Sequence, residues 1–77
     1  MIHPDEVKKM VQGAFSNAQV EVHDQTGTFD HFEIFVMSSQ FIGKSLLEQH
    51  RTVQAAVQEA LADGRIHAVQ IKTKIPK

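Results

Sequence analysis

The 77-residue sequence contains no cysteine, tryptophan or tyrosine, and phenylalanine, at five positions, is its only large aromatic residue. Without cysteine, neither a disulfide nor a zinc–thiolate site can hold the fold, and no thiol can act as a nucleophile or metal ligand. No apolar run reaches the ~18 residues needed to span a membrane. The N-terminus lacks the basic start and apolar stretch of a signal peptide, so we expect a cytoplasmic protein.

Charge is unevenly distributed along the chain. Residues 1–64 carry four basic and nine acidic side chains, whereas residues 65–77 carry no acidic residue and four basic ones, Arg65, Lys72, Lys74 and Lys77. A basic end on an otherwise acidic chain indicates an anionic partner surface or nucleic acid. The same lysines can instead protect an edge strand from aggregation, and the sequence leaves both interpretations open.

Apolar spacing in the first half of the chain predicts a helix over residues 4–15, then strands over residues 20–23 and 30–37 joined by a turn. In the second strand Phe32, Ile34 and Val36 share one face, and the other face carries His31, Glu33, Phe35 and Met37. That other face is only half polar. We therefore expect it to be partly covered or to contact a partner.

In the second half, Ser45 and Glu48 match a capping box that predicts a helix ending at Gly64. Apolar residues thin out near residues 50–52, and the sequence leaves open whether the helix breaks there. Its expected inward stripe consists of Leu46, His50, Val53, Val57 and Leu61, with Leu47 and Ala60 beside them. A last strand is predicted over residues 66–75, with His67 at its start and on the face of Val69 and Ile71.

The predicted order is αββα(α)β in a single domain, residues 1–77, because this length allows only one core. The fold class is α+β, with a three-stranded mixed sheet and helices packed on one face. The order resembles the type II KH topology, and residues 42–46 resemble its Gly-x-x-Gly loop. However, Leu46 stands at the second glycine position, and we expect its side chain to enter the core. Lys44 and Arg51 would be the remaining nucleic-acid contacts.

Histidine supplies most of the chemistry in this sequence, and no catalytic constellation indicates an enzyme. His50 is expected to be a buried, hydrogen-bonded core residue. The separations between His23, His31 and His67 match no local zinc signature, so the pattern does not indicate a dedicated mononuclear zinc site. The acidic residues near the hairpin, Asp24, Asp30 and Glu33, are expected to be solvated.

Three segments resemble the BolA family along nearly the whole chain. They are Asp30-His31-Phe32-Glu33-Ile34, Phe41-x-Gly43-Lys44-Ser45-Leu46-Leu47-x-x-His50-Arg51 and Ile66-His67-Ala68-Val69-x-Ile71-Lys72-Thr73. The sequence between residues 20 and 22 and that between 65 and 69 resemble the small bacterial IbaG-like branch. The family's Thr-Pro-x-x-Trp extension is absent, since the chain reads Thr73-Lys74-Ile75-Pro76-Lys77.

The resemblance implies a KH-like fold and a non-enzymatic partnership with a monothiol glutaredoxin, in which the two proteins share a glutathione-dependent [2Fe–2S] cluster. It assigns His67 as a cluster ligand and implies no cluster in the isolated protein. Many family members have a second ligand, Cys or His, in the hairpin loop. Residues 25–30 contain neither, so either His31 or His23 substitutes or the cluster has only one ligand from this chain.

Partners other than glutaredoxin are also open at this stage. The strand with Lys72 and Lys74 could meet an acidic partner or the carboxylates of glutathione. Family members have also been proposed to regulate transcription in stress and morphology responses, which would use Lys44, Arg51 and the C-terminal basic residues, including Arg65, on DNA or RNA. We expect a monomer, with weak self-association through the last strand left open.

Overall fold

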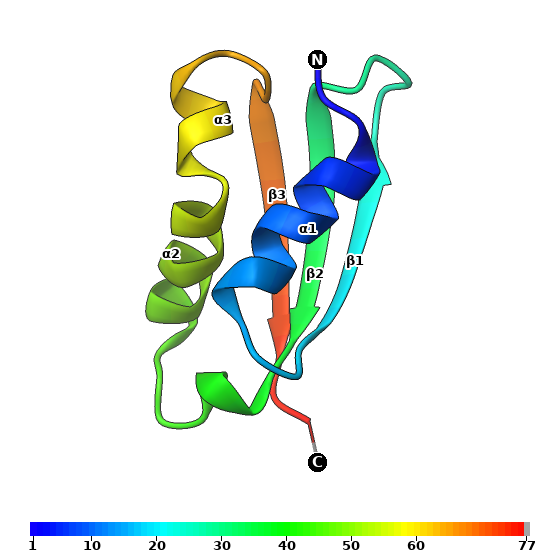
Figure 1. Ribbon diagram of the computed structural model, residues 1–77. Helices are drawn as coiled ribbons and strands as arrows, with labels where there is room; N and C mark the ends of the chain where they lie inside the picture. The colour runs from blue at the N-terminus through cyan, green and yellow to red at the C-terminus, as the bar shows by residue number, and fades with distance from the viewer. Residues whose placement is uncertain (77) are drawn as a thin grey trace.

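The computed structural model describes residues 1–76, so Lys77, one of the cations of the basic end, lies outside the described residues. Within residues 1–76 the chain forms three α-helices, one short 3-10 helix and three strands (Figure 1). In chain order these are α1 (Pro4–Ala14), β1 (Gln19–Asp24), β2 (His31–Met37), η1 (Ser39–Phe41), α2 (Leu46–Ala56), α3 (Gln58–Ala62) and β3 (Ala68–Lys74).

The sheet has β2 in its centre, between β1 and β3. β1 pairs with β2 antiparallel, with Val22 opposite Ile34, and β3 pairs with β2 parallel, with Ile71 opposite Ile34. The parallel pairing follows from the helical connection between β2 and β3, because a chain that crosses over through helices returns in the same direction. The predicted α+β fold with a mixed sheet is confirmed.

The helices cover one face of the sheet, as predicted, and leave the other face open (Figure 1). Phe32, Ile34 and Val36 of β2 point towards the helices and are completely buried. Their neighbours along the strand are only half-buried on the opposite face. The core on the covered side also includes Val7 and Val11 of α1, Phe15, Phe41, Val53, Val57, Ala60 and Ile66.

Two helix starts are capped by side chains, and the cap of α2 is the one that the sequence predicts. Ser45 Oγ accepts a hydrogen bond from Glu48 N at 3.2 Å and donates one to Glu48 Oε1 at 3.1 Å, so Ser45 caps the start of α2. His3 Nδ1 accepts from Asp5 N at 3.1 Å at the start of α1. None of the helices within residues 1–76 is long and apolar enough to cross a membrane.

The predicted inward stripe of α2 is wrong in its first turn. Leu46 and Leu47 are 63% and 60% exposed, so Leu46 does not enter the core, and His50 is half-buried. The side chain that turns inward is that of Gln49, which is 8% exposed. Gln49 can be buried because its amide donates to Lys44 O at 3.0 Å and accepts from Thr73 Oγ1 at 2.6 Å.

Element boundaries also differ from prediction, most clearly at two places. The helix breaks at Val57 rather than near residues 50–52: the N–H of this buried residue bonds to Gln54 O, and α3 begins at Gln58. The last strand begins at Ala68 rather than Ile66. Ile66 N donates to Ala60 O and His67 N donates to Asp30 O, so both residues belong to the connection and not to the ladder.

Candidate metal centre at the start of two parallel strands

The candidate site lies where β2 and β3 begin side by side, at the end of the sheet that also holds the β1–β2 loop (Figure 1). Asp30 immediately precedes β2, and His67 immediately precedes β3. The carbonyl of Asp30 accepts hydrogen bonds from His67 N at 2.8 Å and Ala68 N at 3.3 Å. These bonds join two residues that are far apart in the sequence.

The loop before Asp30 is also held in place. Ile2 N donates to Phe29 O at 3.0 Å, and the ring of His3 packs edge-on against Phe29 with 5.6 Å between centroids. Phe29 has a φ of 57°, an uncommon backbone conformation for a residue with a side chain. Such conformations persist only where the surrounding structure imposes them, so the contacts of the N-terminus fix the approach to Asp30.

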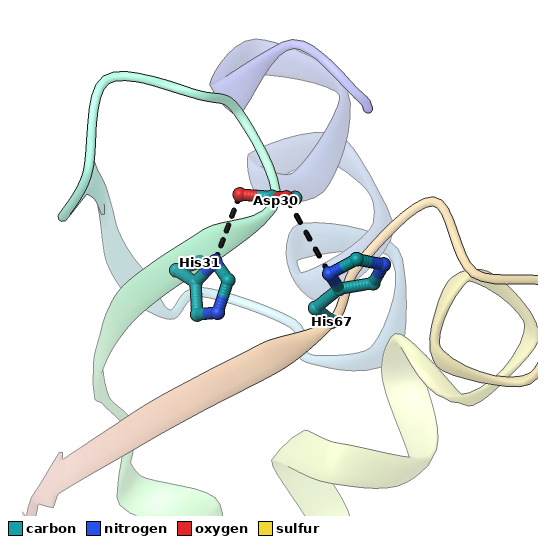
Figure 2. Close-up of side chains that lie close together, drawn as sticks. All are labelled: Asp30, His31 and His67. Carbon is teal, nitrogen blue, oxygen red and sulfur yellow. Dashed lines mark hydrogen bonds and ion pairs between the residues drawn. The ribbon is translucent and has the colours of Figure 1, made fainter.

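One carboxylate connects two imidazoles at this position (Figure 2). Asp30 Oδ1 lies 2.8 Å from His31 Nδ1, and Asp30 Oδ2 lies 3.5 Å from His67 Nδ1. The two histidine rings are 5.8 Å apart between centroids and nearly perpendicular, at 87°. One ligand atom from each of the three residues can be chosen so that all lie within 4.8 Å of one another.

Asp30 is ionised in this arrangement. The Thr28 hydroxyl donates to its carboxylate, and this bond, followed by the hydrogen bond with His31, lowers the pKa of Asp30 from 3.8 to about 2. The side chain of Asp30 is 20% exposed, whereas that of His67 is 64% exposed. The ionised Asp30 is therefore the most buried residue of the cluster, and the imidazole of His67 faces solvent.

Of the three histidines predicted as metal ligands, the structure brings together His31 and His67. His23 lies on β1 opposite Glu33, outside the cluster, and its Nε2 is 3.8 Å from Glu21 Oε1. Asp30, expected from the sequence to be solvated, instead lies between the two rings and is only 20% exposed. The sequence does show that Asp30 is next to His31. It does not show that His67 lies beside Asp30, because that contact depends on the parallel pairing of β2 and β3.

The five predicted basic surface residues do not form one patch. Arg65 lies before β3 and pairs with Asp63 at 2.8 Å, whereas Lys74 ends the same strand. Lys72 projects from the open face of the sheet, where its Nζ lies 3.4 Å from Glu33 Oε2. Lys44 precedes α2 and Arg51 lies within it, and both are exposed.

The fold and the site define a class of protein: a small α+β chain with an open sheet face and an exposed histidine cluster at one end. Because the side chain of His67 is largely exposed, this cluster is accessible from the surface. The BolA-like protein family model matches residues 9–77, which is most of the chain. The chain belongs to the BolA-like family, as its motifs indicated.

Individual relatives agree with this assignment. The acid stress protein IbaG of Escherichia coli K12 is 33% identical over 72 residues, covering 94% of this chain and 82% of IbaG. Protein BOLA2 of Arabidopsis thaliana is 38% identical over 73 residues, covering 94% of this chain and 76% of BOLA2. Among solved structures, a BolA-like protein from Babesia bovis superposes with a TM-score of 0.84 at 28% identity, covering 99% of this chain and 87% of that one.

Proposed function

We propose that this chain is a non-enzymatic partner of a monothiol glutaredoxin and that its His67 and His31 contribute ligands to a [2Fe–2S] cluster shared by the two proteins. Membership of the BolA-like family supports the partnership, through the properties that the resemblance implies. The single observation that carries the proposal is the connection of both imidazoles to Asp30 through their Nδ1 atoms.

The donor chemistry of this cluster fits an iron site. Histidines that bind metals commonly give their second ring nitrogen to a carboxylate, which fixes the tautomer and the ring orientation. Asp30 occupies that supporting position for His31 and His67. Asp30 contacts the Nδ1 atom of each ring. No hydrogen bond to either Nε2 atom is found within residues 1–76, so the Nε2 atoms are free to bind iron.

Each residue then has a separate task. Asp30, ionised and held by Thr28, keeps a proton at His31 Nδ1 and orients the ring. His67, which is largely exposed, presents its imidazole to a partner protein. The bound cluster would supply one-electron redox chemistry, with a potential raised by histidine in place of thiolate. The glutaredoxin would supply its own cysteine and bound glutathione.

The test is to mix the chain with a monothiol glutaredoxin, add iron, sulfide and glutathione, and record the visible circular dichroism spectrum. A 1:1 complex with a spectrum different from that of the glutaredoxin alone is expected. His67→Ala should abolish this spectrum, and His23→Ala should leave it unchanged. A spectrum that survives in His67→Ala would contradict the ligand assignment, and the absence of any complex would contradict the partnership.

Nucleic-acid binding is the second candidate function, and the exposure of Lys44 and Arg51 favours it. Neither residue forms an ion pair within residues 1–76, and Lys44 follows Gly43, whose φ of 81° turns the loop before α2. Titration with mixed DNA and RNA at low and physiological salt tests it. Binding that is lost at physiological salt would be non-specific electrostatic attraction and would rule out this function.

A further inference from the structure

We propose that the isolated chain binds one Zn²⁺ ion through Asp30, His31 and His67. This mononuclear site goes beyond the shared cluster, because it needs no glutaredoxin and uses Asp30 as a ligand rather than as a support. The two proposals also fail separately. A chain that forms the shared cluster but does not bind zinc would refute only the zinc site, and the reverse result would refute only the cluster.

The spacing of the three side chains is close to that of a zinc site. Zinc bonds to nitrogen and oxygen are ~2.1 Å long, so two ligand atoms of a tetrahedral site lie ~3.4 Å apart. The separation of Asp30 Oδ1 from His31 Nδ1 is 2.8 Å, and that of Asp30 Oδ2 from His67 Nδ1 is 3.5 Å. Zinc would replace the proton that His31 Nδ1 donates to Asp30, and this proton would pass to solvent.

Zinc binding would widen the Asp30–His31 contact from 2.8 Å and bring the more distant ligand atoms closer together. Ligand atoms within 4.8 Å of one another need to close by roughly 1 Å to share a zinc ion, given the bond lengths above. The ring of His67, 64% exposed, can make this movement by rotating its side chain. The backbone is already fixed, because both His67 N and Ala68 N donate to the carbonyl of Asp30.

The donor set selects among metal ions. Two imidazoles and one carboxylate suit zinc and the later first-row transition metals, whereas magnesium and calcium prefer oxygen ligands alone. The ionised Asp30 supplies a negative charge to the cluster. The nearby cation Arg65 is bound to Asp63 at 2.8 Å. Three protein ligands also leave a fourth coordination position for water or for a group from another molecule.

The experiment is an isothermal titration of the full chain with Zn²⁺, with Mg²⁺ titrated in parallel. We expect one zinc ion per chain and no heat from magnesium. Asp30→Asn, His31→Ala and His67→Ala should each weaken zinc binding by about tenfold or more, because each removes a ligand. His23→Ala is the matched control, since it removes a histidine from the same open sheet face outside the cluster.

Asp30→Asn is the decisive variant. An exposed pair of histidines can bind zinc weakly without a carboxylate, so zinc binding that is unchanged in Asp30→Asn would overturn the proposal. Zinc binding that His23→Ala weakens as much as His31→Ala does would overturn it as well. Circular dichroism and the melting temperature of each variant, measured with a chelator present, establish that the folds compared are the same.

Discussion

The two faces of β2 are built from adjacent residues and have different physical roles. Phe32, Ile34 and Val36 face the helices and are completely buried, whereas Glu33 and Phe35 lie half-buried on the face that no helix covers. The covered face supplies the apolar burial that holds a chain of this size together. The open face and the end of the sheet carry the ionisable side chains, including the Asp30–His31–His67 cluster.

This division means that stability and chemistry should be separable by mutation. A change on the covered face is expected to unfold the chain, whereas a change in the cluster is expected to alter ligand binding and leave the fold intact. The following variants test that separation.

The largest effect is expected for Phe32→Ala. Removal of a fully buried phenylalanine costs about 3–5 kcal/mol, which is most of the stability of a domain this small. Phe35→Ala, on the open face of the same strand, should cost about 1 kcal/mol, since its side chain is only half-buried. Denaturant unfolding of both variants measures the difference. Equal losses would show that the open face contributes to folding as much as the covered face.

A smaller loss is expected for Gln49→Ala. The buried amide of Gln49 joins α2 to β3 through Thr73 and to the preceding loop through Lys44 O, and its removal leaves these groups unpaired. The expected cost is about 1–3 kcal/mol. Gln54→Ala, an exposed position on the same helix, is the matched control and should change the unfolding free energy by less than about 0.5 kcal/mol. Similar values for the two variants would contradict the structural role of Gln49.

Ser45→Ala should destabilise the chain by about 1 kcal/mol, because it removes the side-chain cap of α2. Ser45→Asp keeps an oxygen that can accept from Glu48 N, and it should retain most of the stability. The melting temperatures of the two variants make the comparison. If Ser45→Asp is destabilised as much as Ser45→Ala, the capping hydrogen bond is not the cause.

The pH dependence of stability should reveal the environment of Asp30. Its pKa in the folded chain is about 2, below the ordinary value of 3.8, so the ionised form is favoured by folding. That contribution is fully present above the ordinary pKa and is lost as the pH falls from about 4 to about 2. The stability difference between the wild type and Asp30→Asn should therefore shrink over this range. A difference that stays constant from pH 5 to pH 2 would contradict the pKa shift.

The sequence was sufficient to predict the order of elements, the hairpin, the parallel third strand and the cap at Ser45, because each depends on local patterns or chain connectivity. It was insufficient for the first turn of α2. Apolar periodicity assigned Leu46 and Leu47 to the core, whereas hydrogen bonds to Thr73 and Lys44 make the polar Gln49 the buried residue. A partner 24 residues away cannot be read from periodicity.

The candidate site was predicted only in part, because it too depends on contacts between residues that are far apart in the sequence. The family resemblance pointed to His67 and left His31 and His23 as alternative second ligands. The choice between these two depends on which strand lies beside His67, and the register that pairs His31 with Ala68 places His31 there. The position of Asp30 depends on the same tertiary contacts. Its carbonyl accepts a hydrogen bond from His67 N, and its carboxylate contacts the Nδ1 atoms of both rings.

The measurement that most directly tests the central claim is reconstitution of the shared cluster with a monothiol glutaredoxin in four parallel samples: wild type, His67→Ala, His31→Ala and His23→Ala. Visible circular dichroism reports the cluster, and denaturant unfolding of each chain alone reports stability. We predict that His67→Ala loses the mixed-cluster spectrum, that His31→Ala weakens it, and that His23→Ala keeps it. His67→Ala and His23→Ala should unfold within about 0.5 kcal/mol of the wild type. His31→Ala, which loses the hydrogen bond to Asp30, should cost about 0.5–1.5 kcal/mol and leave the chain folded. An unchanged spectrum in His67→Ala, with the complex still formed, would contradict the account.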